Sequence, residues 1–285
     1  MLPPMKTIRG LLVFAGTFFA AAFVSGQTVT EFIIAKLNDR YQTTDGSTNS
    51  GDLNNQGNTS AFGIFAQVTG TGLSGTYTFT APGGSPINIS TVETGSLVYE
   101  NAFAYDTSAN LASAFADGNY AMQINTSGGL QNVTGFSLTG DVFPNSPQIT
   151  GGTWSGGKLL LDPTQNYTLN FTGFSGFGAG DKISLSVDGS GNNGHDDASA
   201  IAVTSFFIPA GSIVLANGNT TNVELNFING IAMDTTSVPG ATGLTAYVTI
   251  LSFDIQAIPE PSAYATILGA LVLAGEMIRR RRQPA

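Results

Sequence analysis

Short runs of alternating apolar and polar residues, separated by Gly, Asn, Asp and Pro, constrain the fold of this chain most. A period of two places successive side chains on opposite faces of a β-strand, as in residues 167–172, where Tyr, Leu and Phe alternate with Thr and Asn. Turn residues separate the runs at intervals of about 8 to 20 residues, a spacing typical of sandwiches and barrels. The sequence therefore predicts an all-β sandwich, with strands in residues 62–68, 75–80, 119–124, 135–139, 167–172, 182–187, 200–208, 222–227 and 246–255.

Three other segments need separate interpretation. Residues 107–115 predict one short helix, with Thr107 or Ser108 as its N-cap, ending before Gly118. Residues 31–41 fit a strand or a helix, and the Asn-, Thr- and Gly-rich residues 42–60 predict a loop. Residues 70–75 match G-x-G-x-x-G, but the alternation that follows predicts a strand and not the helix that a dinucleotide site requires.

The charge distribution argues against nucleic-acid binding. Charged residues make up only 10 % of the chain, and six of its ten basic residues lie near the two ends. The body, residues 27–258, has seventeen acidic and four basic residues and so carries thirteen net negative charges. Such a body repels phosphate backbones, so we expect no nucleic-acid partner. The chain has no Cys, which removes thiol nucleophiles and Cys-based metal sites, and we expect no cofactor.

The N-terminal 26 residues have the three parts of a signal peptide. Lys6 and Arg9 form a positive start, residues 10–24 are almost entirely apolar, and small residues follow. We expect cleavage between Gly26 and Gln27 after passage through the Sec translocon, with signal peptidase as a partner; residues 20–22 offer a second cleavage site. The alternative is an uncleaved anchor helix.

The C-terminal segment, residues 259–282, also has three parts. Pro259, Glu260 and Pro261 come first, a mostly apolar run over 262–278 follows, and Arg279, Arg280, Arg281 and Arg282 close it. As a helix the run is about 25 Å long, slightly short of a hydrocarbon core of ~30 Å, so the pattern predicts a single short transmembrane helix. The arginines are expected to stay in the cytoplasm, which places the body outside the inner membrane.

Together these three parts resemble the PEP-CTERM sorting signal of Gram-negative bacteria. Residues 259–265, Pro-Glu-Pro-Ser-Ala-Tyr-Ala, match the usual opening of that signal. The resemblance covers about 24 residues and implies processing by an exosortase, a membrane Cys protease, and delivery to the cell surface or an exopolysaccharide matrix. It implies no chemistry for the body. The alternative is an ordinary tail anchor.

A second resemblance concerns the body. Leu161, Pro163 and Tyr167 are spaced as in the tyrosine corner of fibronectin type III and other immunoglobulin-like sandwiches, where the Tyr hydroxyl bonds to upstream backbone. It covers at most residues 147–258. The predicted organisation is a signal peptide (1–26), an N-terminal strand and loop (27–60), a sandwich body (61–258, with possible halves 61–140 and 144–258) and the sorting anchor (259–282).

The acidic loop around the single histidine, His195, is the one candidate metal site. Asp188, Asn192, Asp196 and Asp197 offer the oxygen ligands that Ca²⁺ prefers, although their spacing does not match an EF-hand. The alternative is a polar turn between two strands, because Gly, Asn and Asp dominate turns for backbone reasons alone. No G-x-S-x-G elbow accompanies His195, which excludes the usual nucleophile motif of serine hydrolases.

The only tryptophan, Trp154, is the candidate ligand-binding residue. An exposed Trp154 would stack on a sugar ring, whereas a buried one would fill the core. We expect a non-catalytic, structural or adhesive protein that is exported and carried through an inner-membrane intermediate to the cell surface, with exopolysaccharide as a candidate ligand. The alternative is a carbohydrate-active hydrolase or carbohydrate-binding protein that uses surface acids and Trp154.

Overall fold

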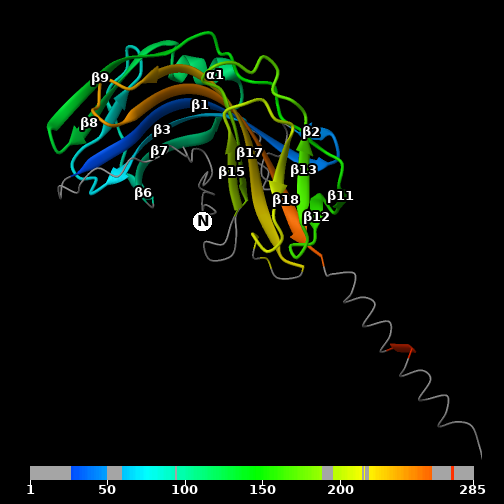
Figure 1. Cartoon of the computed structure of the whole chain (residues 1–285). Coiled ribbons are helices and arrows are strands. Elements are labelled where there is room, and N and C mark those ends of the chain that lie inside the picture. Colours follow the sequence, from blue (N-terminus) through cyan, green and yellow to red (C-terminus); the bar gives the residue numbers. More distant parts are fainter. Residues whose placement is uncertain are drawn as a thin grey trace, which may run out of the picture.

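The computed structural model describes residues 27–49, 60–93, 95–187, 195–213, 215, 218–258 and 271–272. Within these residues the chain is mostly β, with strands in three sheets and one short helix, α1 (Ser108–Ala114). The expected all-β, sandwich-like architecture is confirmed. Figure 1 shows the strands bent into an arch, with α1 and the strands beside it on the outer side.

The largest sheet forms the spine of the arch. Its central path runs β15-β14-β17-β18-β1-β3-β7-β6, with β12 also paired to β18, β11 to β12 and β2 to β1. Its strands are β1 (Thr28–Thr44), β2 (Ser47–Asn49), β3 (Phe62–Thr71), β6 (Thr91–Glu93), β7 (Ser96–Tyr105), β11 (Thr153–Ser155), β12 (Lys158–Leu161), β14 (Lys182–Val187), β15 (His195–Ser199), β17 (Thr220–Asp234) and β18 (Thr242–Ala257).

Two small sheets complete the sandwich. The first has the order β5-β4-β8-β9 and the second β10-β13-β16. Their strands are β4 (Thr78–Thr80), β5 (Ile87–Asn88), β8 (Gly118–Thr126) and β9 (Gly129–Leu138) in the first, and β10 (Ile149–Thr150), β13 (Tyr167–Phe171) and β16 (Ser205–Ile208) in the second.

Both small sheets cover the same face of the large sheet, as the alternation along β18 shows. Tyr247 packs in the core cluster that contains residues of the first small sheet, whereas Leu251 and Phe253 pack in the cluster that contains residues of the second. All three have odd numbers and therefore point to one side of the strand. Each small sheet thus forms its own core against a different part of one shared large sheet.

The opposite face of the large sheet carries a third apolar cluster. It includes four even-numbered residues in the middle of β18, each at most 2 % exposed: Leu244, Ala246, Val248 and Ile250. Because both faces of β18 are buried here, its middle reads as a nearly continuous apolar run instead of a simple alternation.

Residues 31–41, which the sequence left open between strand and helix, lie within β1 at the centre of the large sheet. β1, the first described strand of the body, pairs parallel to β18, the last one, and antiparallel to β3. The possible halves 61–140 and 144–258 correspond to the two small sheets, but the large sheet runs through both. Strands from both ends of the chain therefore share one hydrogen-bonded framework.

Two further local predictions can be compared with the structure. Thr107 caps α1, with its side chain accepting a 3.1 Å hydrogen bond from the Asn110 amide, as expected. Residues 195–197 were expected in a loop, but they begin strand β15, which pairs with β14. This prediction was wrong because β15 lies at the edge of the sheet, where acidic side chains remain exposed while the backbone pairs.

Candidate functional site

The predicted terminal signals lie almost entirely outside the described residues. Gln27 is described, and its side-chain amide donates hydrogen bonds to the Tyr77 hydroxyl and the Asn125 carbonyl oxygen. Among the described residues, no helix has the length and apolarity needed to cross a membrane. The signal residues outside the described ranges are Gly26, Pro259, Glu260, Pro261, Arg279, Arg280, Arg281 and Arg282.

The candidate metal residues are only partly described, and the two that are described diverge. Asp196 pairs across the sheet with Ser186, whose hydroxyl donates a 2.7 Å hydrogen bond to it, whereas Asp197 pairs with Leu185. Neighbouring residues of a strand point to opposite faces, so these two carboxylates do not converge on one ion. Asp188 and Asn192 lie outside the described residues. In the described part of the chain, no group of three or more His, Cys, Asp or Glu is placed to hold a metal.

Trp154 is neither fully exposed, as sugar stacking would require, nor fully buried as a core residue. Its ring is half-buried and packs against the core of the second small sheet, 6.1 Å from the Phe253 ring. Its indole nitrogen, Nε1, donates a 3.1 Å hydrogen bond to the Gly151 carbonyl oxygen. One side of the ring is therefore engaged in packing, and its polar atom already has a partner.

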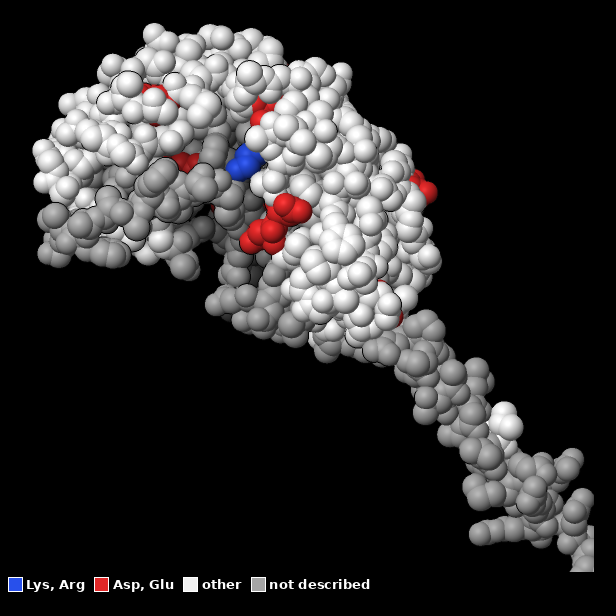
Figure 2. Space-filling view, viewed as in Figure 1, with Lys and Arg blue, Asp and Glu red and all other residues white. Residues whose placement is uncertain are grey.

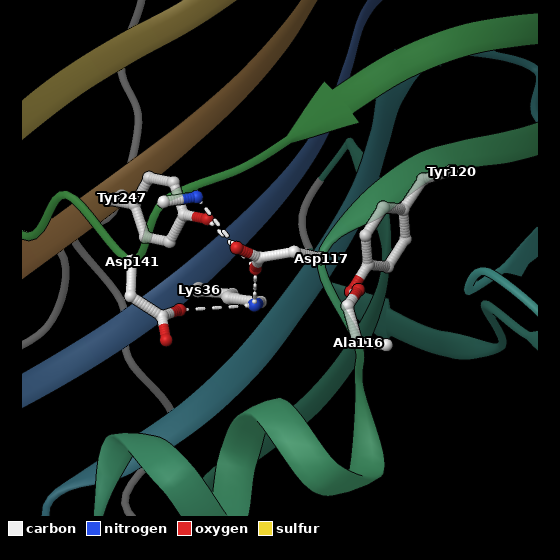
Figure 3. A network of polar contacts seen from close by, with 7 residues as sticks. Lys36, Ala116, Asp117, Tyr120, Asp141 and Tyr247 are labelled. Atoms are coloured by element: carbon white, nitrogen blue, oxygen red, sulfur yellow. Dashed lines mark hydrogen bonds and ion pairs between the residues drawn. The ribbon is translucent and has the colours of Figure 1, made fainter.

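The most concentrated polar chemistry of the described chain surrounds a buried lysine, Lys36 (Figure 3). The Lys36 side chain is 0 % exposed, and its Nζ lies 2.6 Å from Asp117 Oδ1 and 3.3 Å from Asp141 Oδ1. The Tyr247 hydroxyl donates a 3.3 Å hydrogen bond to Asp117 Oδ1, and the Gly140 amide donates one of 2.6 Å to Asp117 Oδ2. Lys36 Nζ also lies 5.7 Å from the centre of the Tyr247 ring.

Strand geometry explains why a lysine is found here. Phe32 and Ile34 point from β1 into the core of the first small sheet, and Lys36 occupies the next position on that face. Asp117 lies between α1 and β8, and Asp141 follows the end of β9. Both carboxylates thus come from the ends of small-sheet elements and meet the lysine at the edge of this core.

The surroundings of this cluster shift the pKa values of Asp117 and Tyr247 in opposite directions. Desolvation raises the pKa of Asp117, but the hydrogen bonds from Lys36, Gly140 and Tyr247 and the lysine charge outweigh it, so the pKa lies below its usual value. Burial raises the pKa of the Tyr247 hydroxyl well above its usual range, and the negative charge of Asp117 raises it further. These shifts favour a charged Asp117 carboxylate that accepts a hydrogen bond from a neutral Tyr247 hydroxyl.

Two more unusual carboxyls, Glu31 and Asp39, lie on the opposite face of β1. Burial raises the pKa of Glu31 to about 7, although the charge of Lys182 lowers it in part. Burial raises the pKa of Asp39 well above its usual range, and the charges of Glu224 and Glu100 add to this effect. Asp39 lies eight positions after Glu31 along the same extended strand, a distance of about 26 Å.

These geometries bear on the hydrolase alternative. A glycosidase needs two carboxyls within about 5 to 10 Å, one of them a general acid with a raised pKa. Glu31 and Asp39 are too far apart, whereas Asp117 and Asp141 share one lysine and the pKa of Asp117 is lowered. Neither of these two pairs therefore meets the requirement.

The sequence did not single out Lys36, which counted only as one of four basic residues in the body. The sequence pattern could have identified this lysine. Lys36 follows Phe32 and Ile34 at alternate positions of one strand, so it lies on the same inward face and places a cation there. The partners Asp117 and Asp141 could not be found in this way, since they lie 81 and 105 residues further along the chain.

Comparisons with known proteins add no family to this description. No protein-family model matches the sequence, and a search of curated proteins finds no match.

Proposed function

We propose that this chain is an exported surface or matrix protein of a Gram-negative bacterium, non-catalytic and structural or adhesive, which an exosortase system sorts. The observation that carries the proposal is the succession of three parts in the C-terminal sequence: Pro259-Glu260-Pro261, an apolar run and Arg279–Arg282. It is accompanied by an N-terminal sequence with the features of a signal peptide ending at Gly26. In this proposal residues 262–278 form a short transmembrane helix until processing.

The character of the body supports this assignment. The described exterior seen in Figure 2 is largely uncharged, with scattered acidic groups and basic side-chain atoms in a single place. A surface of Ser, Thr, Asn and Gly suits contact with a hydrated polymer better than contact with a polyanion, which the net negative charge would repel. Exopolysaccharide is therefore the proposed ligand class.

The finer fold assignment is also a proposal. We expect an immunoglobulin-like arrangement for residues 144–258, in which Tyr167 opens β13 after the turn at Pro163. In support, the Tyr167 hydroxyl lies so close to Gly152 that a Cβ there would come within 2.7 Å of it, so this tyrosine packs against upstream backbone.

Reading both ends of the mature protein tests the sorting proposal. The full chain is expressed in a bacterium that carries an exosortase and in a strain from which it is deleted, and the surface fraction is analysed by mass spectrometry. We expect a surface form that begins at Gln27 and lacks Arg279–Arg282 only where the exosortase is present. Recovery of the intact chain in the cytosol, with both ends uncut, would overturn the proposal.

Charge-neutral variants sharpen this experiment. Replacing Arg279, Arg280, Arg281 and Arg282 with Gln removes the basic block without shortening the tail, so processing should fail and the protein should remain with its membrane segment. The matched control is Lys158→Gln, which removes one basic residue from the body and should leave processing unchanged. Equal processing of both variants would contradict the role of the arginines.

A further inference from the structure

The Lys36 cluster holds an amine and a carboxyl in direct contact. Lys36 Nζ lies 2.6 Å from Asp117 Oδ1, and the lysine side chain is fully buried. A bound pair of this kind needs no diffusion or reorientation to meet, which is the main entropic obstacle to joining two groups. The two residues come from different parts of the fold, since Lys36 lies on β1 of the large sheet and Asp117 immediately precedes β8 of the first small sheet.

The surroundings of Asp117 resemble the donor arrangement of an acyl-transfer site. The Gly140 amide donates a 2.6 Å hydrogen bond to Asp117 Oδ2, and the Tyr247 hydroxyl donates one to Oδ1. Two donors on one carboxyl stabilise the negative charge that develops on its oxygens when a nucleophile adds to the carbon. Each oxygen of the Asp117 carboxyl thus accepts one of these hydrogen bonds, which fixes its position.

A second carboxylate is placed to carry a proton. Asp141 Oδ1 lies 3.3 Å from Lys36 Nζ, within reach of a proton leaving the amine. Asp141 is also the only non-glycine residue with a positive φ, 45°, among the residues that the structure describes. A strained backbone conformation of this kind is retained where the surrounding structure requires the side chain in one position.

We propose that Lys36 and Asp117 condense to an intramolecular isopeptide bond once the sheets have packed together. A proton passes from the Lys36 ammonium to the Asp117 carboxylate, which leaves a neutral amine and a neutral acid. The Nζ lone pair attacks Cγ of Asp117 to form the C–N bond while Asp141 takes a second proton from Nζ. Asp141 then returns this proton to a hydroxyl on Cγ, the C–O bond breaks and water leaves.

The step balances without any further reactant. An ammonium and a carboxylate give an amide and one water, with no net change of charge and no oxidation or reduction. The Asp117 side chain is 36 % exposed, so the water has a path to solvent. The ion pair described above is the state before reaction, and because the pKa of Asp117 is lowered, the neutral amine and acid that react are a minor form of it.

The bond would act as a cross-link in a chain that has no Cys and hence no disulfide. It would join β1 of the large sheet to the start of the first small sheet across a separation of 81 residues. Closing so long a loop restricts the unfolded chain more than closing a short one. The proposal concerns the body alone and does not depend on the sorting of the chain.

Peptide-level mass spectrometry of the purified, folded protein tests the proposal. We expect a branched peptide that joins the segments around Lys36 and Asp117, lighter by one water than the sum of the two. If the wild-type protein yields both segments as separate linear peptides, the proposal is overturned. This readout needs only the wild-type chain, so it stands even where a variant fails to fold.

Lys36→Arg separates the isopeptide from the nearest chemical alternative. Asp117 precedes Gly118, and cyclisation of an Asp-Gly pair to a succinimide also loses one water. An arginine keeps the positive charge but offers no amine for this amide, so the water loss should disappear in Lys36→Arg. Persistence of the loss at Asp117 in this variant would identify the succinimide and refute the isopeptide.

Two further variants complete the test. Asp141→Asn keeps Lys36 beside Asp117 but removes the proton acceptor, so the fraction of branched peptide should fall at least tenfold at equal age of the sample. Lys158→Arg, which changes a lysine outside the cluster, should leave the branched peptide unchanged. An undiminished yield in Asp141→Asn would contradict the role assigned to Asp141.

Discussion

Gln42 pairs with Ile149 as a neighbouring strand would, although 107 residues separate them in the chain. The Gln42 amide nitrogen donates a 2.7 Å hydrogen bond to the Ile149 carbonyl oxygen, and the Ile149 amide donates one of 2.7 Å to Gln42 Oε1. Both residues are buried. One side chain near the end of β1 therefore bonds to both backbone groups of a residue that begins the second small sheet, and the Gly46 amide donates a further 3.1 Å hydrogen bond to the Ile149 carbonyl oxygen.

Replacing Gln42 with Met should destabilise the protein substantially. Met has a similar length but cannot bond to the backbone, so the N–H of Ile149 would lose its Gln42 acceptor while the C=O would keep the Gly46 amide as a donor, at a cost of about 1–3 kcal/mol. Chemical denaturation with urea measures this. The matched control is Gln256→Met, where an exposed side chain donates to the Gly218 carbonyl oxygen and water can replace the bond. A similar loss in both variants would contradict the importance of the buried pairing.

Glu31 should make the protein less stable as the pH rises from about 4.5 to about 7. Its pKa is raised on folding to about 7, so the folded state holds this proton more tightly than the unfolded state does. Stability from this group is therefore complete below its ordinary pKa and is lost through that window, about 3 kcal/mol in all. Unfolding free energies measured by urea denaturation across this pH range give the slope.

Glu31→Gln should reduce this decline, because the amide does not titrate. A residual decline is expected from Asp39, whose pKa is also raised by burial. Asp197→Asn, a change of an exposed acid on the edge strand β15, serves as the control and should leave the slope as it is. If the slope in Glu31→Gln equals that of the wild type, the titrating group lies elsewhere.

Gly243 lies beneath the contact between two aromatic rings of the first core. The rings of Phe32 and Phe136 are 5.4 Å apart, and a Cβ at Gly243 would come within 2.6 Å of Phe136 and closer still to Phe32. Gly243→Ala should therefore cost about 1–3 kcal/mol through overpacking, as thermal unfolding would show. At Gly173 the nearest atom is Thr204 Cγ2 at 3.8 Å, so Gly173→Ala should change stability by less than about 0.5 kcal/mol.

Trp154 provides an optical test of the carbohydrate-active alternative. As the only tryptophan, it dominates the fluorescence of the protein. Because its ring packs on Phe253 and its Nε1 bonds to Gly151, we expect oligosaccharides from the host exopolysaccharide to leave its emission unchanged. Trp154→Ala should cost about 2 kcal/mol, less than a fully buried aromatic residue would. A saturable shift of the emission on adding sugar would favour the alternative.

Local sequence by itself determined much of the secondary structure. The alternation in residues 167–172 and 182–187 located β13 and β14, and Thr107 marked the start of α1, because side-chain direction and capping depend on neighbours in the chain. The same signals failed where pairing outweighed composition, as in β15, whose acidic residues resemble a turn but pair with β14. The terminal signals remain predictions, which rest on the order of residues alone.

Only the tertiary structure decided which residues meet. The parallel pairing of β1 with β18 brings the two ends of the body together, and this places Lys36 beside Tyr247 at the edge of a core. Asp117 and Asp141 then reach the lysine from the small-sheet side. Such contacts depend on strand register and sheet order, which arise from hydrogen bonds and packing between distant segments and leave no periodic trace in the sequence.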